Sequence, residues 1–260
     1  MKIAMYRLKH IVMATQKGLI TITGTIGGFN FYEDNGKNIA RRSGGGFNGE
    51  AIKTKPEMVR VRENSSEFGM VSKAKKVFRL GLYPFLKDIK DITLHGRMMS
   101  LFQTIKVLDT FSERGKRIFQ NGLTTDEGRT LLQDFAFTPQ KASSMLPGVG
   151  IFDPVTQQYT VSDINLNNLR LPKGASGMQV YFGVLVADFD AETSMLFKSN
   201  VIFIDINFSV PSFTLTPDSL PSGSGTRISV LQVRYYQEVN GKVFLFYELG
   251  EQGVAVLGVY

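Results

Sequence analysis

The side chains best suited to binding a partner form a run of cations between Lys37 and Arg79. This segment holds 11 Lys and Arg residues and four Glu residues. Clustered cations attract phosphate groups and acidic protein surfaces, so the segment is the predicted partner-binding site. The residues of this predicted basic patch are Arg41, Arg42, Arg60, Arg62, Lys73, Lys75, Lys76 and Arg79.

The same cations also fit a solvated helix face. Lys73, Lys75 and Lys76 are expected opposite the apolar stripe of their helix, where nearby Glu residues could pair with them. No helix-turn-helix, RNA-recognition or zinc-finger signature accompanies the cations. A protein partner, either another copy of the chain or an acidic protein surface, is therefore favoured, and nucleic acid is the alternative partner.

Three glycines near the N-terminus raise the question of a phosphate cradle. Gly24, Gly27 and Gly28 lie in the segment GTIGG, but a P-loop needs a following Gly-Lys-Ser/Thr that opens a helix. No such tripeptide follows, so all three are predicted to be structural glycines of a β-hairpin.

Catalytic chemistry has few candidate residues. The chain has no Cys and two His residues, which excludes Cys nucleophiles, thiolate metal sites and three-His metal sites. Asp188, Asp190 and Glu192 could bind a cation or act as paired carboxylates, but their spacing does not match an EF-hand and a solvated strand end is favoured. His95 is expected to pack or cap at a helix start. The prediction is a non-enzymatic chain with no catalytic residue, metal, cofactor or small-molecule substrate.

Charge is distributed unevenly along the 260 residues. The formal net charge is +7; residues 1–133 carry 23 Lys and Arg against 12 Asp and Glu, and residues 134–260 carry 7 against 11. Helical patterning also gives way to short apolar alternations near Asp134. Both observations predict two domains: 1–133, a hairpin plus a basic helical region, and 134–260, a β-sandwich.

The elements of the first domain follow from turn and helix signals. Asn35-Gly36 predicts a tight turn within a hairpin over 17–43. Residues 56–92 have helical spacing that Pro84 should divide.

The clearest apolar stripe lies in residues 93–121, which are predicted to form one helix that starts after Thr93. A short helix capped by Thr124 or Thr125 follows.

The second domain reads as strands. Alternating apolar residues recur between turn signals, of which Asn240-Gly241 is the strongest, and the strand count approaches seven. The predicted fold class is α+β: an N-terminal β-hairpin and small helical bundle followed by an antiparallel immunoglobulin-like β-sandwich.

Several segments of the chain resemble a known family. They are GTIGGFNFY at 24–32, Ala40-Arg41-Arg42 with the triple glycine, RVRENSSEFG at 60–69 and SKAKKVFRL at 72–80. Together they are similar to a family of uncharacterised Bacteroidota proteins, over residues 13–120. The resemblance implies a Gly-rich N-terminal hairpin, a basic helical region and a β-rich C-terminal half, and it implies no activity.

Chains of that family begin near a Met-Ala like Met13-Ala14, so residues 1–12 are expected to be an upstream extension. Cations spread through residues 1–20 and a short apolar run do not fit a secretory signal, and no apolar run reaches the roughly 20 residues of a membrane helix. The expected location is the cytoplasm, with no membrane span, and export by a route that the sequence does not show is the alternative.

The predicted function is that of a non-enzymatic structural or interaction protein. A basic region and an acidic region in one chain favour head-to-tail contacts between copies, as in a subunit of a larger particle or filament. The alternative function is nucleic-acid association through the basic helical region.

Overall fold

The computed structural model describes residues 13–16, 21–43 and 49–260. The contacts divide the chain into two compact units, residues 1–62 (unit 1) and residues 63–260 (unit 2). The sequence predicts a boundary near Asp134, whereas this division falls between Arg62 and Glu63. The expectation for residues 1–12 lies outside the described residues.

Unit 1 contains a four-stranded antiparallel sheet in the order β1-β4-β3-β2. Its elements are β1 (Met13–Thr15), β2 (Gly24–Ile26), β3 (Phe29–Asp34), β4 (Lys37–Arg42), α1 (Gly49–Thr54) and a 3₁₀ turn (Pro56–Met58).

Tight turns join the strands of this sheet. Gly27 and Gly28 connect β2 to β3 with φ of +56° and +82°, and Asn35 and Gly36 connect β3 to β4 with φ of +50° and +74°. Two successive positive φ angles match the twist of antiparallel strands and favour Gly and Asn. The turn predicted at Asn35-Gly36 is therefore present, and it joins one of two hairpins in a sheet of four strands.

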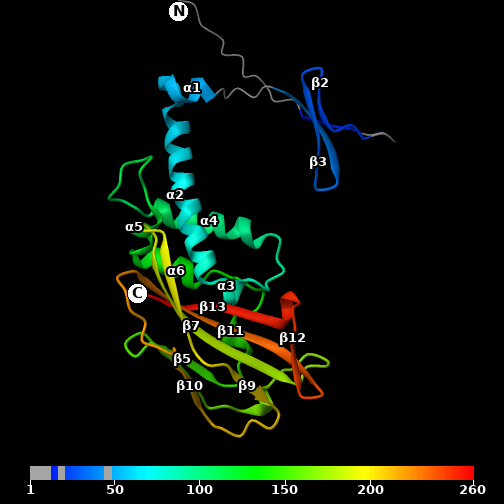
Figure 1. Ribbon diagram of the computed structural model, residues 1–260, viewed down its shortest axis with the longest axis vertical. Helices are drawn as coiled ribbons and strands as arrows, with labels where there is room; N and C mark the ends of the chain where they lie inside the picture. The colour runs from blue at the N-terminus through cyan, green and yellow to red at the C-terminus, as the bar shows by residue number, and fades with distance from the viewer. Residues whose placement is uncertain (1–12, 17–20, 44–48) are drawn as a thin grey trace, which may run out of the picture. The chain divides into compact units, whose positions relative to one another are not determined.

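Unit 2 combines helices with two antiparallel sheets (Figure 1). Its helices are α2 (Val59–Gly81, which begins in unit 1), α3 (Tyr83–Leu86), α4 (Leu94–Val107), α5 (Phe119–Leu123), α6 (Asp126–Gln133), α7 (Ala142–Met145) and the 3₁₀ turns Leu166–Asn168 and Leu249–Glu251. Its strands are β5 (Val149–Asp153), β6 (Gln158–Ser162), β7 (Gly177–Asp188), β8 (Thr193–Lys198), β9 (Ile202–Asp205), β10 (Phe213–Leu215), β11 (Thr226–Val239), β12 (Lys242–Leu245) and β13 (Gln252–Val259).

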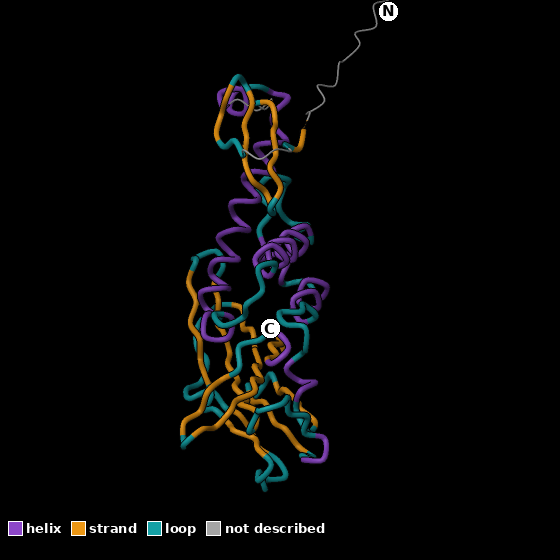
Figure 2. The backbone as a smooth tube through the Cα atoms, turned by 90° about the vertical axis from the view of Figure 1, so that its right-hand side faces the viewer, coloured by secondary structure: helices purple, strands orange, loops and turns teal. Residues whose placement is uncertain are grey.

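The two long strands β7 and β11 form the centre of the larger sheet, which we call the main sheet. Its order is β12-β11-β7-β8, with β13 also paired to β11 and β9 to β7, and it curls into an open half-barrel. The smaller sheet has the order β10-β6-β5. Within unit 2, most helices gather toward one end and the long strands extend toward the other (Figure 2).

One face of the main sheet packs against the helices. Phe78 of α2 and Phe102 of α4 belong to a buried cluster that also includes Leu185 of β7 and Val230 of β11. The two phenyl rings meet edge to face with centroids 5.4 Å apart. Helices and strands therefore share this core.

The other face of the main sheet packs against the smaller sheet. Val161 of β6 and Leu215 of β10 cluster with Phe182 of β7 and Leu231 of β11. The main sheet is thus a middle layer between helices and a second sheet. This arrangement of helices with antiparallel sheets agrees with the α+β class predicted from the sequence.

Two helix predictions meet different outcomes. The break predicted at Pro84 is present, because α2 ends at Gly81 and α3 follows. The single helix predicted over 93–121 is wrong, since α4 ends at Val107. There the carboxylate of Asp109 accepts hydrogen bonds from the N–H groups of Ser112 (3.0 Å) and Ile118 (2.9 Å), which organises a loop in place of further helix.

The shared core gives the first prediction. A fragment that begins at residue 134 would expose the buried faces of Leu185 and Val230 to water, because their helical partners would be missing. We expect residues 63–260 to unfold cooperatively in urea, with near-ultraviolet circular dichroism typical of fixed packing, and residues 134–260 to show neither property. Cooperative unfolding of the shorter fragment would contradict this reading of the core.

Candidate functional site

One face of the sheet in unit 1 carries three large apolar side chains together with Glu33 and Arg42. Register places Phe29 opposite Arg42, Phe31 opposite Ala40, and Ile26 opposite Phe29, so these side chains share a face. We call this surface the aromatic face. Phe29 is 46% exposed and Ile26 is 57% exposed.

The opposite face of the same sheet carries Thr25, Asn30, Tyr32, Ile39 and Arg41, and several of these side chains contact one another. The hydroxyl of Thr25 donates to the Asn30 side chain at 2.6 Å, and the guanidinium of Arg41 lies 5.5 Å from the centre of the Tyr32 ring. The predicted patch residues Arg41 and Arg42 therefore lie on opposite faces of β4. Only Arg42 lies beside the two phenyl rings.

Unit 1 has no described core. Of the residues between 15 and 62 whose exposure the structure describes, none is buried. A sheet of three or more strands needs a hydrophobic face or a packed helix for independent stability, and exposed apolar patches mark interaction sites. The aromatic face is therefore a surface suited to a partner.

Unit 1 also carries the whole net charge of the protein. Residues 1–62 contain 11 Lys and Arg against four Asp and Glu, or +7, whereas residues 63–260 contain 19 of each. Two patch residues, Arg60 and Arg62, belong to this unit at the start of α2. Arg62 is tied to the backbone there, because it donates to the carbonyl oxygens of Ile52 (2.6 Å) and Lys55 (3.0 Å).

The remaining patch residues, Lys73, Lys75, Lys76 and Arg79, belong to the part of α2 in unit 2. Three of them are exposed and one is buried. Lys76 and Arg79 are exposed, and Lys73 forms a 2.6 Å ion pair with Glu192. Lys75 is 6% exposed and lies 3.0 Å from Nε2 of His95. The eight residues predicted as one patch are thus divided between the two units.

Lys75 corrects the expected solvated face of this helix. It lies four residues after Val71 and three before Phe78, both of which are fully buried, so it belongs to the apolar stripe and not to its opposite side. Burial lowers the pKa of Lys75, and the nearby charge of Arg79 lowers it further. The spacing of Lys75 from Val71 and Phe78 in the sequence already indicated that its side chain lies on the buried side of the helix.

The acidic segment after β7 forms a turn. Asp188 accepts hydrogen bonds from the N–H groups of Asp190 (3.0 Å) and Ala191 (2.8 Å), and Glu192 pairs with Lys73. Among the described residues, no group of three or more Asp, Glu or His side chains converges on a common metal position.

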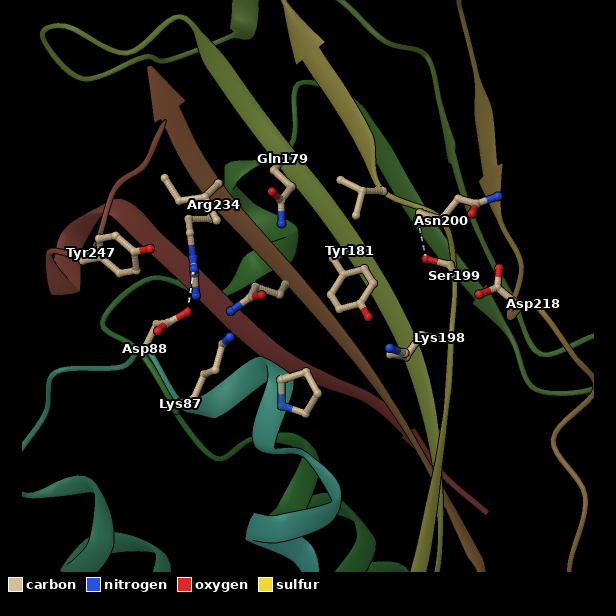
Figure 3. Close-up of a pocket in the computed structure, with 14 residues that line it drawn as sticks. Lys87, Asp88, Gln179, Tyr181, Lys198, Ser199, Asn200, Asp218, Arg234 and Tyr247 are labelled. Carbon is tan, nitrogen blue, oxygen red and sulfur yellow. Dashed lines mark hydrogen bonds and ion pairs between the residues drawn. The ribbon is translucent and has the colours of Figure 1, made fainter. Parts of the chain in front are cut away.

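A second candidate site, which the sequence reasoning did not identify, is a cavity of about 480 Å³ in unit 2 (Figure 3). It lies between the end of α3 and the part of the main sheet that carries Gln179, Tyr181 and Gln232. Residues that line it include Lys87, Asp88, Tyr181, Lys198, Arg234 and Tyr247.

Buried amides connect α3 to the wall of this cavity. The Nε2 group of Gln232 donates to the carbonyl oxygen of Phe85 at 3.0 Å, and that of Gln252 donates to the carbonyl oxygen of Asp88 at 3.1 Å. Arg234 donates to the carboxylate of Asp88 at 2.9 Å. These contacts hold the chain after α3 at a fixed place on the sheet.

No described helix is both long and apolar enough to span a bilayer. Comparison of the chain with family models, with curated proteins and with solved structures finds no match.

Proposed function

We propose that this chain is a non-enzymatic interaction protein whose unit 1 binds single-stranded nucleic acid on the aromatic face. One observation carries the proposal: the exposed ring of Phe29 and the half-buried ring of Phe31 share a face of β3 in the unit that holds the entire net charge of +7. Bases stack on aromatic side chains presented by a sheet, and cations beside them contact the phosphates.

The division of charge between the units favours a polyanion over a second copy. The sequence predicts head-to-tail contact between copies, because residues 1–133 are basic and residues 134–260 are acidic. Unit 2, however, joins basic helices to acidic strands and has no net charge. It therefore offers unit 1 little overall attraction, whereas a nucleic acid offers a phosphate at every nucleotide.

The spacing on β3 suits a single strand. Phe29 and Phe31 are two residues apart, so their rings project from the same face with one strand pleat between them. Arg42 lies directly opposite Phe29 on the neighbouring strand. Each base stacked on an aromatic ring contributes about 1–3 kcal/mol, so two rings and a phosphate contact support sequence-tolerant binding.

The test is fluorescence anisotropy with labelled oligo(U) and oligo(dT) of about 12 nucleotides, within the site sizes of stacking platforms, and with a duplex of equal length. We expect single strands to bind more tightly than the duplex, with affinity falling linearly in log salt. Replacing both Phe29 and Phe31 with Ala should weaken binding by at least about tenfold, whereas Tyr at both positions should retain it.

Substitution of two arginines, one on the aromatic face and one in unit 2, distinguishes a local phosphate contact from an effect of net charge. Arg42→Gln should weaken binding and reduce the salt slope, because one phosphate contact is lost. Arg170→Gln removes an exposed arginine of unit 2 and should leave binding unchanged. Equal effects of the two substitutions, or full binding by the Phe29→Ala, Phe31→Ala variant, would remove the basis for this function.

Self-association is measured in parallel by sedimentation velocity across salt concentrations. A salt-sensitive oligomer that forms without nucleic acid, and that dissociates when the same Phe residues are replaced, would favour assembly of copies instead.

In the proposed function, the two packed sheets of unit 2 act as the scaffold. An immunoglobulin-like arrangement of their strands stays a prediction.

A further inference from the structure

We infer that the cavity between α3 and the main sheet binds a small molecule that carries a carboxylate or phosphate group. This site lies wholly within unit 2 and does not depend on the function proposed for unit 1. Its volume of about 480 Å³ falls in the range of about 300–1,000 Å³ that is typical of small-molecule sites.

The first observation is a change of polarity along one face of the main sheet. Where this face covers the helices it is apolar, with Leu185 on β7 and Ile228 on β11. Register continues the same face to Tyr181, which is opposite Gln232, and to Gln179, which is opposite Arg234. Gln232 is 3% exposed and Arg234 is 2% exposed.

Burying a polar side chain costs free energy unless it is hydrogen-bonded, and departures from this pattern are expected at functional sites. Gln232 has its amide group bound to the carbonyl oxygen of Phe85, which accounts for its donor. Arg234 is only partly accounted for. Its two terminal nitrogens donate to Asp88 (2.9 Å) and Gln252 (3.2 Å), but its Nε–H is buried without a hydrogen-bond partner among the described residues. The wall of the cavity therefore holds a charged donor with unused capacity.

The second observation is a pair of ammonium groups at the cavity. Lys87 follows α3 and Lys198 ends β8, and neither ammonium group makes a hydrogen bond or ion pair with another described residue. Figure 3 shows the Lys198 side chain beside the hydroxyl of Tyr181, and the Lys87 side chain on the same side of the cavity as Asp88 and Arg234. A third cation, Arg234, is neutralised by Asp88, which leaves Asp218 as the one other carboxylate that lines the cavity. The lining is thus cationic by one charge.

Tyr181 adds a neutral donor at the same place. Burial raises its pKa, and the negative charge of Asp218 raises it further, so the phenol keeps its proton at neutral pH. Its ring stacks on Phe85 with centroids 4.9 Å apart, which fixes the direction of the hydroxyl. Two ammonium groups and a phenol at one polar cavity match the oxygens of a carboxylate or phosphate.

The experiment is isothermal titration calorimetry of the full chain with inorganic phosphate and, separately, with citrate, at ionic strength held constant with sodium chloride. We expect saturable binding of at least one probe, and the tighter probe identifies phosphate or carboxylate as the preferred group. Lys87→Gln and Lys198→Gln should each weaken that binding by about tenfold or more, the loss of one charge-assisted hydrogen bond. Both side chains are exposed, so folding should survive.

Lys173→Gln is the matched control, because Lys173 is exposed in unit 2 and does not line the cavity. Its affinity should equal that of the native chain. The Phe29→Ala, Phe31→Ala variant should also bind the probe normally, which keeps this site separate from the aromatic face. Absence of saturable binding for both probes, or binding that persists in the Lys87→Gln, Lys198→Gln double variant, would overturn the inference.

Discussion

Replacing Glu67 with Gln is expected to destabilise the protein by about 3–5 kcal/mol, the usual cost of removing one partner from a buried ion pair. Glu67 is 2% exposed and its carboxylate lies 2.5 Å from Nζ of Lys106, which is itself buried. The same carboxylate accepts from Nε of Arg117 at 2.8 Å and from the N–H of Gly115 at 2.7 Å. A neutral amide would leave the Lys106 ammonium group buried without a counter-charge.

The ionisation of Glu67 also predicts how stability depends on pH. The hydrogen bond from Arg117, together with those from Lys106 and Gly115, lowers the pKa of Glu67 from 4.5 to about 2 despite its burial. A carboxyl group whose pKa is depressed on folding contributes stability that is fully present above about pH 4.5 and is lost as pH falls toward 2. The shift corresponds to about 3 kcal/mol.

Urea denaturation at pH 6 and at pH 3 measures both effects. The native protein should lose stability between the two values, and Glu67→Gln should lose less, because its side chain does not titrate. Glu113→Gln is the control, since Glu113 forms an ion pair with Lys116 in which both side chains are largely exposed. That substitution should cost less than about 1 kcal/mol. A Glu67 variant as stable as the control would refute the importance of the buried network.

Gly122→Ala is expected to cost about 3 kcal/mol or more, at the upper end of the range for overpacking a core. Gly122 is a buried residue of α5 whose missing side chain lets α4 approach closely. A methyl group at this position would overlap the carbonyl oxygen of Ile105, which is backbone and cannot rotate away. The two helices would have to separate.

Gly69→Ala provides the matched comparison. Gly69 lies within α2, and a methyl group there would meet no atom within 4 Å. Alanine is favoured over glycine in a helix interior by about 0.8–1.0 kcal/mol, so this variant should be more stable than the native protein. Thermal unfolding of both variants decides the matter: equal effects would show that α4 and α5 do not require contact at Gly122.

Local sequence determined the turns and breaks of this protein. Asn35-Gly36 and Asn240-Gly241 adopt positive φ at both residues between paired strands. The hydroxyl of Thr125 caps α6 by accepting from the N–H of Gly128 at 3.0 Å. Such features depend on the steric and hydrogen-bonding preferences of a few neighbouring residues, so they can be read without knowledge of distant segments.

The candidate sites were predictable only in part. The composition of the first 62 residues already showed that this segment is basic. It did not show that Phe29 and Phe31 would share a face with Arg42, because that depends on the register between β3 and β4. Lys75 could have been placed inside the helix stripe from its spacing to Val71, but a charged residue is normally assigned to the surface.

Only the tertiary structure decided where α4 ends and where the cavity lies. α4 stops at Val107 because Asp109 binds the N–H of Ile118, nine residues further along the chain. Arg234 became a buried cavity residue because β11 pairs with β7 and β13, while Asp88 approaches from the segment after α3, 146 residues away in the chain. The free energy of such contacts depends on segments that meet only after folding, so no local pattern specifies them.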